Sequence, residues 1–421
     1  MSGSSTRPGV VALIAALDTK GDDASFIRHR LEAGGVQVRT VDVGVLADPT
    51  TTADYPANDV AERGGSPLTS LRQRNDRAAA VAVMTEGARV LISELLRAGE
   101  IDAVFAIGGG AGTTIGAAAM RELPLGVPKV ILTTVAAGNT ANYLGTSDIV
   151  LFPSVVDVAG VNSISALTYT AAADAMVGMV NGLPTRTGPA TTRPVIGASM
   201  FGVTTPAVMR AKQRLEDSGC EVIVFHATGS GGRTMERLCA EGHFAAVLDL
   251  TTTEWADETV GGILSAGPDR LSAAARTGTP QVVSVGATDM VNFGRRDSVP
   301  EQFADRTFYE HNAENTLMRV NAEEAARIGE NIGRQLSQAT GPTVVLLPAG
   351  GVSALDAPGA AFDDPQVREH LAAALVAQVD PTVVRVIRVD HHINDPEFAD
   401  LATEQLLDLL AHVTSEQGRS S

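Results

Sequence analysis

The chain has 421 residues, of which 44% are hydrophobic, and its 49 acidic and 32 basic residues give a formal net charge of −17. This length exceeds what one ordinary hydrophobic core supports and predicts two or three domains. The negative charge argues against binding of nucleic acid or of an anionic membrane by bulk electrostatics, so an anionic ligand needs a local positive site.

The location of the protein is predicted from what the sequence lacks. No apolar run reaches the roughly 18 residues needed to span a bilayer, and the first residues, MSGSSTRPG, contain no apolar signal region. The two cysteines, Cys220 and Cys239, have no metal-ligand spacing and are expected to be buried or incidental thiols. These features predict a cytoplasmic protein without a membrane partner.

Apolar, β-rich runs alternate with helical patterns in the first half of the chain. The expected strands cover residues 10–17, 36–45, 103–107, 129–133 and 149–152, and the expected helices lie near 22–33, 76–98 and 112–122. A long and nearly uncharged helical stretch follows at residues 157–181. Its Ala, Val and Met content predicts burial, with another subunit as one candidate partner.

A cluster of helix and strand breakers, NGLPTRTGP at residues 181–189, predicts a linker. After it the alternation resumes, with expected strands at 195–201, 221–225, 245–250, 281–285, 344–347 and 383–389. The fold class predicted is α/β, with two Rossmann-like parallel-sheet domains: a nucleotide-binding domain over residues 1–188 and a second domain over 189–421. A faint repeat, RLEAGGVQV and RLEDSGCEV, supports this division, although ordinary helix–turn–strand chemistry gives the same pattern.

The segment FAIGGGAGTT, residues 105–114, is the first candidate binding motif, because a strand pattern runs directly into glycines and then into a helix. Glycine lets the backbone approach an anion, and the free N–H groups of the following helix attract negative charge. The spacing matches neither the dinucleotide fingerprint nor the Walker P-loop, so a tight turn without ligand remains the alternative. The candidate residues are Gly108, Gly109, Gly110, Gly112, Thr113 and Thr114, the threonines as hydroxyl donors or metal ligands.

A second turn, DTKGDD, follows the first expected strand and contains Asp18, Thr19 and Lys20. Lys20 is one of only three lysines, against twenty-nine arginines, and an ammonium group supplies a point charge for a phosphate. The alternative is a solvated lysine beside acidic residues that cap the helix. Because the carboxyl ends of parallel strands converge, Lys20 and the glycine loop are expected to face the same ligand.

The second half contains polar loops after several expected strands, including HATGSGGRT at residues 226–234, a second candidate anion cradle. General acid–base chemistry suits a histidine with a carboxylate as partner or metal ligand. The candidates are His226, Asp249, Glu254, Asp289 and His311. For any single loop the structural alternative is that its polar residues only cap the next helix.

Several of these motifs together resemble one family. LDTKGDD, FAIGGGAGTT, HATGSGGRTME, GATDMVNFG, HNAENTLMRVNAEE, PAGGVSALDAPG and HHINDPEFAD are similar to bacterial and fungal proteins related to the amino-terminal half of the tomato-mosaic-virus resistance protein. The resemblance spans nearly the whole chain and implies two α/β subdomains, ATP binding in the first one with Mg²⁺, and a homodimer or higher homo-oligomer. It places ATP contacts on Thr19, Lys20, the glycine loop, Thr85 and Thr133.

Plant members of this family continue into a TIM-barrel module, so a separate TIM-barrel protein is a candidate partner. The sequence therefore predicts a Mg²⁺-dependent cytoplasmic enzyme that acts on a small, oxygen-rich anionic metabolite at an interdomain cleft. In this hypothesis Asp18 or Asp22 assists the metal, and the substrate is bound by arginines, with Arg233, Arg295, Arg296 and Arg319 as candidates. The alternative is a non-catalytic, ATP-regulated binding module or scaffold for a partner protein.

Overall fold

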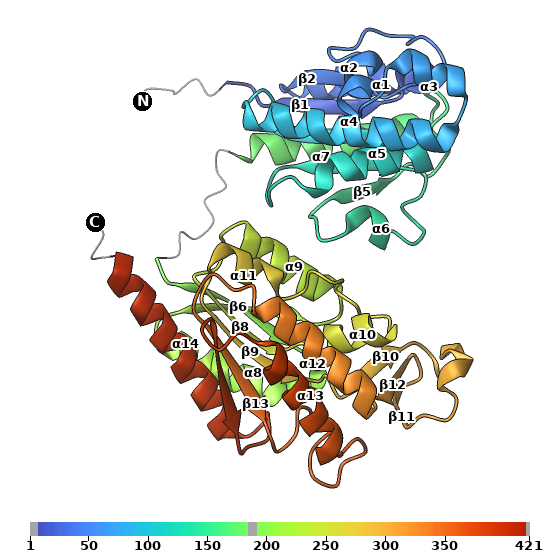
Figure 1. Ribbon diagram of the computed structural model, residues 1–421. Coiled ribbons are helices and arrows are strands. Elements are labelled where there is room, and N and C mark those ends of the chain that lie inside the picture. Colours follow the sequence, from blue (N-terminus) through green and yellow to red (C-terminus); the bar gives the residue numbers. More distant parts are fainter. Residues whose placement is uncertain (1–6, 184–191, 418–421) are drawn as a thin grey trace. The chain divides into compact units, whose positions relative to one another are not determined.

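The computed structural model describes residues 7–183 and 192–417, so the predicted linker lies mostly outside the described residues. The chain divides into two compact units, Met1–Pro189 and Ala190–Ser421. Each unit contains a parallel sheet with helices on both faces, as Figure 1 shows. The predicted α/β class with two Rossmann-like domains is confirmed.

The first unit is built on a five-stranded sheet with the order β2-β1-β3-β4-β5. All neighbouring strands pair in parallel. The order reverses direction at β1 and β3, and in open α/β sheets ligands bind at the carboxyl ends of the strands at such a point. The strands are β1 (Val10–Ala15), β2 (Gln37–Asp42), β3 (Ala103–Gly108), β4 (Lys129–Thr133) and β5 (Val150–Pro153).

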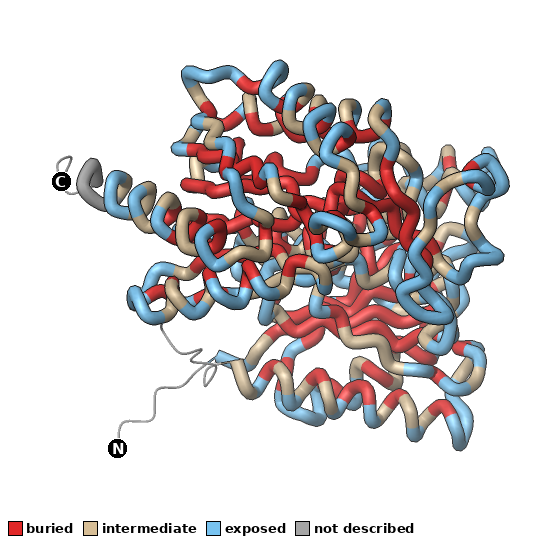
Figure 2. The backbone as a smooth tube through the Cα atoms, turned by 90° about the horizontal axis from the view of Figure 1, so that it is seen from below, coloured by how far each residue is buried: buried red, intermediate tan, exposed pale blue. Residues whose placement is uncertain are grey.

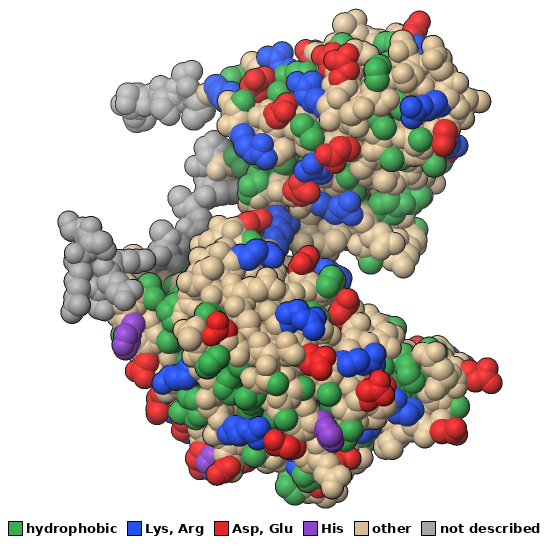
Figure 3. Space-filling view, in the orientation of Figure 1, with side chains coloured by type: hydrophobic (Ala, Val, Ile, Leu, Met, Phe, Trp, Pro, Cys, Tyr) green, Lys and Arg blue, Asp and Glu red, His purple; other side chains and the backbone are tan. Residues whose placement is uncertain are grey.

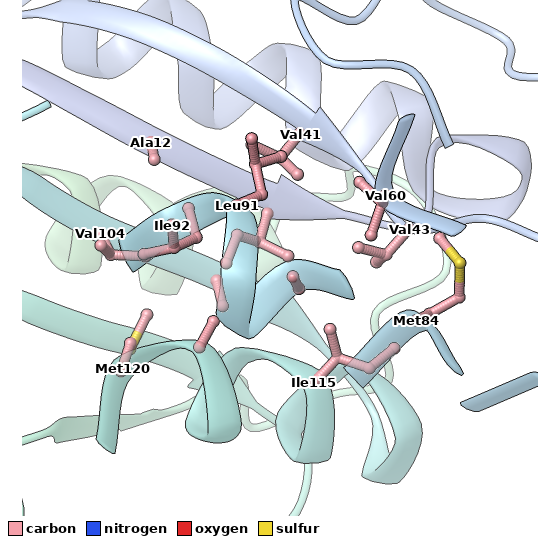
Figure 4. Packing of buried hydrophobic residues seen from close by; sticks show 14 of the residues in the cluster. Ala12, Val41, Val43, Val60, Met84, Leu91, Ile92, Val104, Ile115 and Met120 are labelled. Carbon is pink, nitrogen blue, oxygen red and sulfur yellow. The ribbon is translucent and has the colours of Figure 1, made fainter. Parts of the chain in front are cut away.

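Helices cover both faces of this sheet because alternate strand residues point to opposite sides. Ala12 and Ile14 pack in one cluster with α2, α4 and α5, while Leu13 and Ala15 pack in another with α1 and α7. Figure 4 shows the first cluster, in which Met84 and Leu91 of α4 approach Ile115 of α5 and the strand residues. The helices are α1 (Leu17–Ala33), α2 (Ala57–Arg63), α3 (Leu68–Arg74), α4 (Arg77–Arg97), α5 (Gly110–Arg121), α6 (Ala141–Leu144) and α7 (Ser165–Asn181).

Two helix starts differ from expectation. Helix α1 begins at Leu17, before the DTKG turn, because the buried Asp42 carboxylate accepts the Leu17 N–H at 3.0 Å and takes the place of a cap. Lys20 is non-helical (φ −133°, ψ 24°) and kinks the helix after its first turn. Helix α7 begins at Ser165, later than the 157–181 pattern indicated.

The second unit contains a six-stranded parallel sheet in the order β14-β13-β9-β8-β6-β7. Its first strand, β6, lies between the next two strands of the chain, β7 and β8, just as β1 lies between β2 and β3 in the first unit. The two segments of the faint sequence repeat occupy equivalent places, because one connects α1 to the edge strand β2 and the other connects α8 to the edge strand β7. The strands are β6 (Val195–Met200), β7 (Glu221–His226), β8 (Ala246–Thr251), β9 (Gln281–Gly286), β13 (Thr343–Pro348) and β14 (Val384–Val389).

A small antiparallel sheet, which the sequence did not predict, is inserted between β9 and α12 of the second unit. It consists of β10 (Met290–Phe293), β11 (Phe308–Asn312) and β12 (Asn315–Arg319). Helices α8 and α14 pack on one face of the six-stranded sheet, and α9, α11, α12 and α13 on the other. The helices are α8 (Thr205–Asp217), α9 (Ser230–Ala240), α10 (Glu254–Val260), α11 (Ser272–Thr277), α12 (Ala322–Leu336), α13 (Pro365–Gln378) and α14 (Pro396–Gln417).

Burial and surface charge follow the expectations from composition. Figure 2 shows the strands as the most buried segments, and both Cys220 and Cys239 are buried free thiols. On the face seen in Figure 3, basic side chains are interspersed with acidic ones. Within residues 7–183 and 192–417, no helix has the length and apolar character required to cross a bilayer.

Close packing of α5 on β3 fixes where α5 begins. Gly116 lies so near the strand that a Cβ on it would stand 2.5 Å from the Cβ of Ala106. The helix therefore lies directly against the strand that precedes it, and its first turn is held at the end of β3.

We expect Gly116→Ala to lower the free energy of unfolding by about 1–3 kcal/mol, because the added methyl group overpacks the helix–strand contact. The matched control is Gly178→Ala in α7, where a Cβ would meet no atom within 4 Å. This control is expected to be neutral or to stabilise by up to about 1 kcal/mol. Urea denaturation measures both, and equal stabilities of the two variants would contradict the proposed contact.

The second unit buries one carboxylate, Asp257, that has no cationic partner in the part of the chain that the structure describes. Asp257 of α10 is fully buried and accepts hydrogen bonds from the Asn292 N–H (3.0 Å), the Asn292 side-chain amide (2.7 Å) and the Leu264 N–H (3.3 Å). Burial is the main cause that raises the pKa of Asp257 to about 7, and the hydrogen bonds from Asn292 oppose it. The ionised form of Asp257 therefore costs stability in the folded protein.

This raised pKa predicts a pH dependence of stability. Between the ordinary carboxyl pKa and about 7, the folded state binds more protons at Asp257 than the unfolded state, so the free energy of unfolding falls as pH rises through that range. We expect Asp257→Asn to show a smaller loss of stability between pH 5 and pH 8 than the unmodified protein. Denaturant titrations at both pH values test this, and identical pH slopes would exclude Asp257 as the source.

Candidate functional site

A pocket of about 490 Å³ lies at the carboxyl ends of the neighbouring strands β1 and β3. Its lining includes Asp18, Thr19 and Lys20 from the start of α1 and residues 108–112 of the glycine loop. The two turns that the sequence predicted to face one ligand thus border the same space. Of the eleven predicted ATP-contacting residues, those in the lining are Asp18, Thr19, Lys20, Gly108, Gly109, Gly110 and Gly112.

Lys20 differs from the other two lysines in its partners. Its ammonium group donates to the carbonyl oxygen of Val158 at 2.5 Å, and within the described parts of the chain it forms no ion pair. Lys129 and Lys212, by contrast, are paired with Asp148 and Glu216. Lys20 therefore borders the pocket with a positive charge that forms no ion pair among the described residues.

The loop after β2 forms another wall of the pocket and is held there by Asp18. One oxygen of the Asp18 carboxylate, Oδ2, accepts the N–H groups of Leu46 (2.7 Å) and Ala47 (3.3 Å). Its other oxygen, Oδ1, is buried without a hydrogen-bond partner. Arg72 also holds this loop, because its guanidinium donates to the carbonyl oxygens of Val45 and Ala47.

The glycine loop leads into α5 without a side-chain cap. Its N-cap residue is Gly109, so the first N–H groups of the helix receive no hydrogen bond from a capping side chain. The turn itself needs Gly108 and Gly112, because a Cβ on Gly108 would stand 3.0 Å from the Gly112 Cα and one on Gly112 would stand 3.1 Å from the Ile107 carbonyl oxygen. At Gly110 a Cβ would meet nothing within 4 Å, so the fold does not require glycine there.

Four of the five predicted threonines lie outside the pocket lining, and only Thr19 belongs to it. Thr113 and Thr133 are fully buried, and their hydroxyl groups bond to each other at 2.6 Å, which ties α5 to β4. Thr114 donates to the carbonyl oxygen of Gly110 at 2.9 Å. Thr85 lies on α4 beside the pocket residue Met84, with its hydroxyl oxygen buried and unpartnered. The structure therefore gives Thr113, Thr114 and Thr133 local hydrogen-bonding roles.

Sequence reasoning missed the apolar wall of the pocket and two cations of its lining, Arg72 and Arg77. The wall is formed mainly by α3 and α4, with Leu71, Ala80, Val81 and Met84. Arg77, the first residue of α4, also lines the pocket, is exposed, and forms no ion pair among the described residues. A cation in the first turn of a helix opposes the helix dipole, and this is the signal that distinguishes Arg77 in the sequence.

The second glycine loop is filled by a side chain of the protein itself. Glu254 Oε1 accepts the N–H groups of Gly229 (2.7 Å) and Gly232 (3.1 Å). A Cβ on Gly232 would stand 2.0 Å from Glu254 Oε2. The predicted second anion cradle therefore holds an internal carboxylate.

Glu254 and Asp249, two predicted catalytic candidates, belong to one buried network around Arg270. This guanidinium is 1% exposed and bonds both oxygens of Asp249 (2.5 and 2.7 Å), Glu254 Oε2 (2.6 Å) and Glu236 Oε1 (3.1 Å). A buried guanidinium requires such partners because an unpaired charge is costly to bury. These contacts favour the structural alternative for Asp249 and Glu254.

The other three candidates are separate from this network. Asp289 is buried and accepts a hydrogen bond from the Ser353 hydroxyl at 2.8 Å. Its burial, and to a smaller extent repulsion from Asp356, raise the pKa of Asp289 well above the ordinary range. It borders a cavity of about 20 Å³, which holds about one water molecule. His226 is exposed and stacks on the Phe201 ring at 5.4 Å, and His311 is exposed on β11.

The predicted substrate arginines already have partners. Arg233 donates to the carbonyl oxygen of Ser265, Arg295 pairs with Asp297, Arg296 lies 3.8 Å from the Phe308 ring centroid, and Arg319 pairs with the buried Asp356. No group of three or more His, Cys, Asp or Glu side chains in the described ranges is arranged to hold a metal ion. The second unit thus uses most of its predicted polar residues internally.

Comparison with known proteins identifies the family. Residues 9–185 match the N-terminal domain, and residues 193–410 the C-terminal domain, of the uncharacterised protein family UPF0261. A UPF0261 protein of Clostridium tetani is 43% identical over 401 residues, which is 95% of this chain and 98% of that protein.

The ToMV resistance protein Tm-1(GCR237) of Solanum lycopersicum is 38% identical over 418 residues, covering 95% of this chain and 55% of that protein. Among solved structures, UDP-N-acetylglucosamine 2-epimerase from Rickettsia bellii aligns over 98% of this chain and 99% of its own, with 9% identity and a TM-score of 0.23. The family resemblance read from the motifs is confirmed, and the chain belongs to the uncharacterised protein family UPF0261.

Proposed function

We propose that the first unit binds ATP in the pocket at the carboxyl ends of β1 and β3. The observation that carries this proposal is that Lys20, which lacks an ion-pair partner among the described residues, and the uncapped start of α5 border one pocket. Helix N-termini and ammonium groups both attract phosphate oxygens. The volume of about 490 Å³ lies within the range of small-molecule sites, roughly 300–1,000 Å³.

The two sides of the pocket suit the two ends of a nucleotide. Phosphates are placed at Lys20 and the glycine loop, with Arg77 as a further cation. The base and sugar are placed against the apolar wall with Leu71, Val81 and Met84. This division between an apolar wall and a few convergent polar groups is typical of ligand sites.

Magnesium fits this arrangement through Asp18. The Asp18 carboxylate, whose Oδ1 has no hydrogen-bond partner among the described residues, would hold the ion, since Mg²⁺ usually takes one or two carboxylates together with phosphate oxygens and water. Bound there, Mg²⁺ would neutralise phosphate charge. Asp22, the other predicted residue, is exposed, does not line the pocket, and is the less suitable of the two.

We further infer that the bound ATP serves a cytoplasmic enzyme that acts on a small, oxygen-rich metabolite. The alternative is that ATP regulates a binding module. An anionic substrate held by the second-unit arginines has less support, because those arginines pair with other residues of the same unit. Turnover of ATP in the presence of metabolite pools, rather than thermal stabilisation alone, separates the enzyme from the binding module.

The contribution of Lys20 is tested by Lys20→Met, which keeps the side-chain length and removes the charge. We expect the affinity for Mg·ATP to fall about 10- to 100-fold, because hydrogen bonds to charged groups contribute about 1.5–3 kcal/mol. Isothermal titration calorimetry measures the change, with Lys212→Met in the second unit as the matched control. If Lys20→Met binds as tightly as the control, Lys20 is not part of the site.

The close approach of a ligand to the glycine loop is tested by Gly110→Ala. The added methyl group meets no protein atom, so thermal stability is expected to stay the same or rise slightly, while Mg·ATP affinity falls at least about tenfold. Gly178→Ala, with equally free space, is the control. Unchanged ATP affinity in Gly110→Ala would place the phosphates elsewhere.

A further inference from the structure

A second pocket of about 530 Å³ lies beside the first one in the amino-terminal unit. It is bordered by the end of β2, by residues 48–53 of the following loop, and by the start of α2. Arg72 lines both pockets, so the two spaces are neighbours. None of the predicted site residues lies in this second pocket.

The pocket contains one deeply buried charged group, Asp42. This residue is 2% exposed, and its Oδ1 accepts the N–H groups of Leu17 (3.0 Å) and Gly44 (2.8 Å). Its other oxygen, Oδ2, accepts no hydrogen bond from the described residues, and Asp42 lines the pocket. A buried carboxylate whose free oxygen borders a pocket requires hydrogen-bond donors from outside the protein.

The remaining lining supplies hydroxyl groups and small apolar surfaces. The hydroxyl groups of Thr51 and Thr52 form no hydrogen bond to the described parts of the chain, whereas that of Thr50 donates to the Leu17 carbonyl oxygen at 3.0 Å. Pro49 and Leu68 are among the apolar residues of the lining. The only cation in the lining, Arg72, is bound to Asp48 and to two carbonyl oxygens.

The wall between the two pockets is a single loop with fixed anchors. Residues 43–46 line the first pocket and residues 48–53 line the second. The loop lies against α1 because Gly21 has no side chain, and a Cβ there would stand 1.9 Å from the Thr50 hydroxyl oxygen. The DTKG turn thus contributes Lys20 to one pocket and, through Gly21, supports the wall of the other.

We propose that the second pocket binds a small polyhydroxyl compound, whose hydroxyl groups donate to Asp42 Oδ2 and exchange hydrogen bonds with Thr51 and Thr52. A carboxylate acceptor and two free hydroxyl groups match a ligand with several O–H groups, and the absence of an uncommitted cation in this lining disfavours an anion. The binding site stands on its own geometry. Its role as the site of the metabolite that is used together with ATP rests on the proposed function.

The test uses the full chain without nucleotide and a panel of named probes. Saturation-transfer NMR is recorded with glycerol, erythritol and myo-inositol as polyols, and with ethanolamine and putrescine as amines. We expect at least one polyol to receive saturation from the unmodified protein. Asp42→Asn, which retains an acceptor for Leu17 and Gly44, is expected to weaken that binding about tenfold or more, and Thr51→Val to weaken it less.

Asp59→Asn on α2, outside the lining, is the matched control and is expected to bind the polyol as the unmodified protein does. The proposal is overturned if no polyol binds, if only the amines bind, or if Asp42→Asn binds the polyol unchanged while thermal denaturation shows that it is folded. Calorimetry with Mg·ATP on the same variants separates the two ideas. Polyol binding without ATP binding would keep the site and remove its role beside ATP, whereas ATP binding without polyol binding would refute the site alone.

Discussion

Two carboxylates near the carboxyl edge of the first sheet, Asp42 and Asp18, fix the position of the loop after β2. Asp42 and Asp18 each accept two backbone N–H groups, and these four bonds join the start of α1 to the loop after β2. Burial is the largest influence on the pKa of Asp42 and raises it. The backbone hydrogen bonds from Gly44 and Leu17 oppose this rise. A buried carboxylate tolerates its environment only when such donors surround it, so this loop cannot relax into the adjacent spaces without leaving the charges unsatisfied. Both pockets of the first unit depend on this constraint.

The two units differ in whether their cationic side chains are paired with carboxylates. In the second unit, Arg270 and Arg319 are buried beside carboxylates of the same unit. In the first unit, Lys20 and Arg77 border a pocket and form no ion pair among the described residues. Because stability alone favours pairing of a half-buried charge, Lys20, which is half-buried and lies at the carboxyl edge of a parallel sheet, is the stronger indication of a ligand.

The sequence was sufficient for the two parallel sheets and for the polar side of the candidate site, but not for the antiparallel sheet of β10, β11 and β12. Alternating apolar runs and breakers predict the strands, and the convergence of parallel strands predicts that Lys20 and Gly108 border one space. The start of α1 was not predictable, because its N–H partner is Asp42, twenty-five residues away. The apolar wall was missed for a similar reason: α3 and α4 resemble ordinary core helices until the fold places Leu71 and Met84 opposite the glycine loop.

The polar loops of the second unit show the limit of residue type as evidence. Asp249 and Glu254 have the residue type expected of a carboxylate partner for a catalytic histidine, yet sequence does not reveal that Arg270 binds both of them. The presence of Asp or Glu in the sequence does not reveal whether the partner of its carboxylate is a substrate or a buried guanidinium. Only the three-dimensional contacts distinguish these cases, and the structural alternative gains support for both residues.

The internal carboxylate at the second glycine loop makes the two units functionally unequal despite their shared strand order. A tethered group competes with free molecules at an effective concentration set by its attachment, which is far above that of cellular metabolites. The Gly229–Gly232 turn is thereby saturated at all times, and its occupancy does not vary with metabolic conditions. Of the two glycine turns, the one at Gly108–Gly112 holds no internal carboxylate among the described residues, while the one at Gly229–Gly232 is a permanent internal contact.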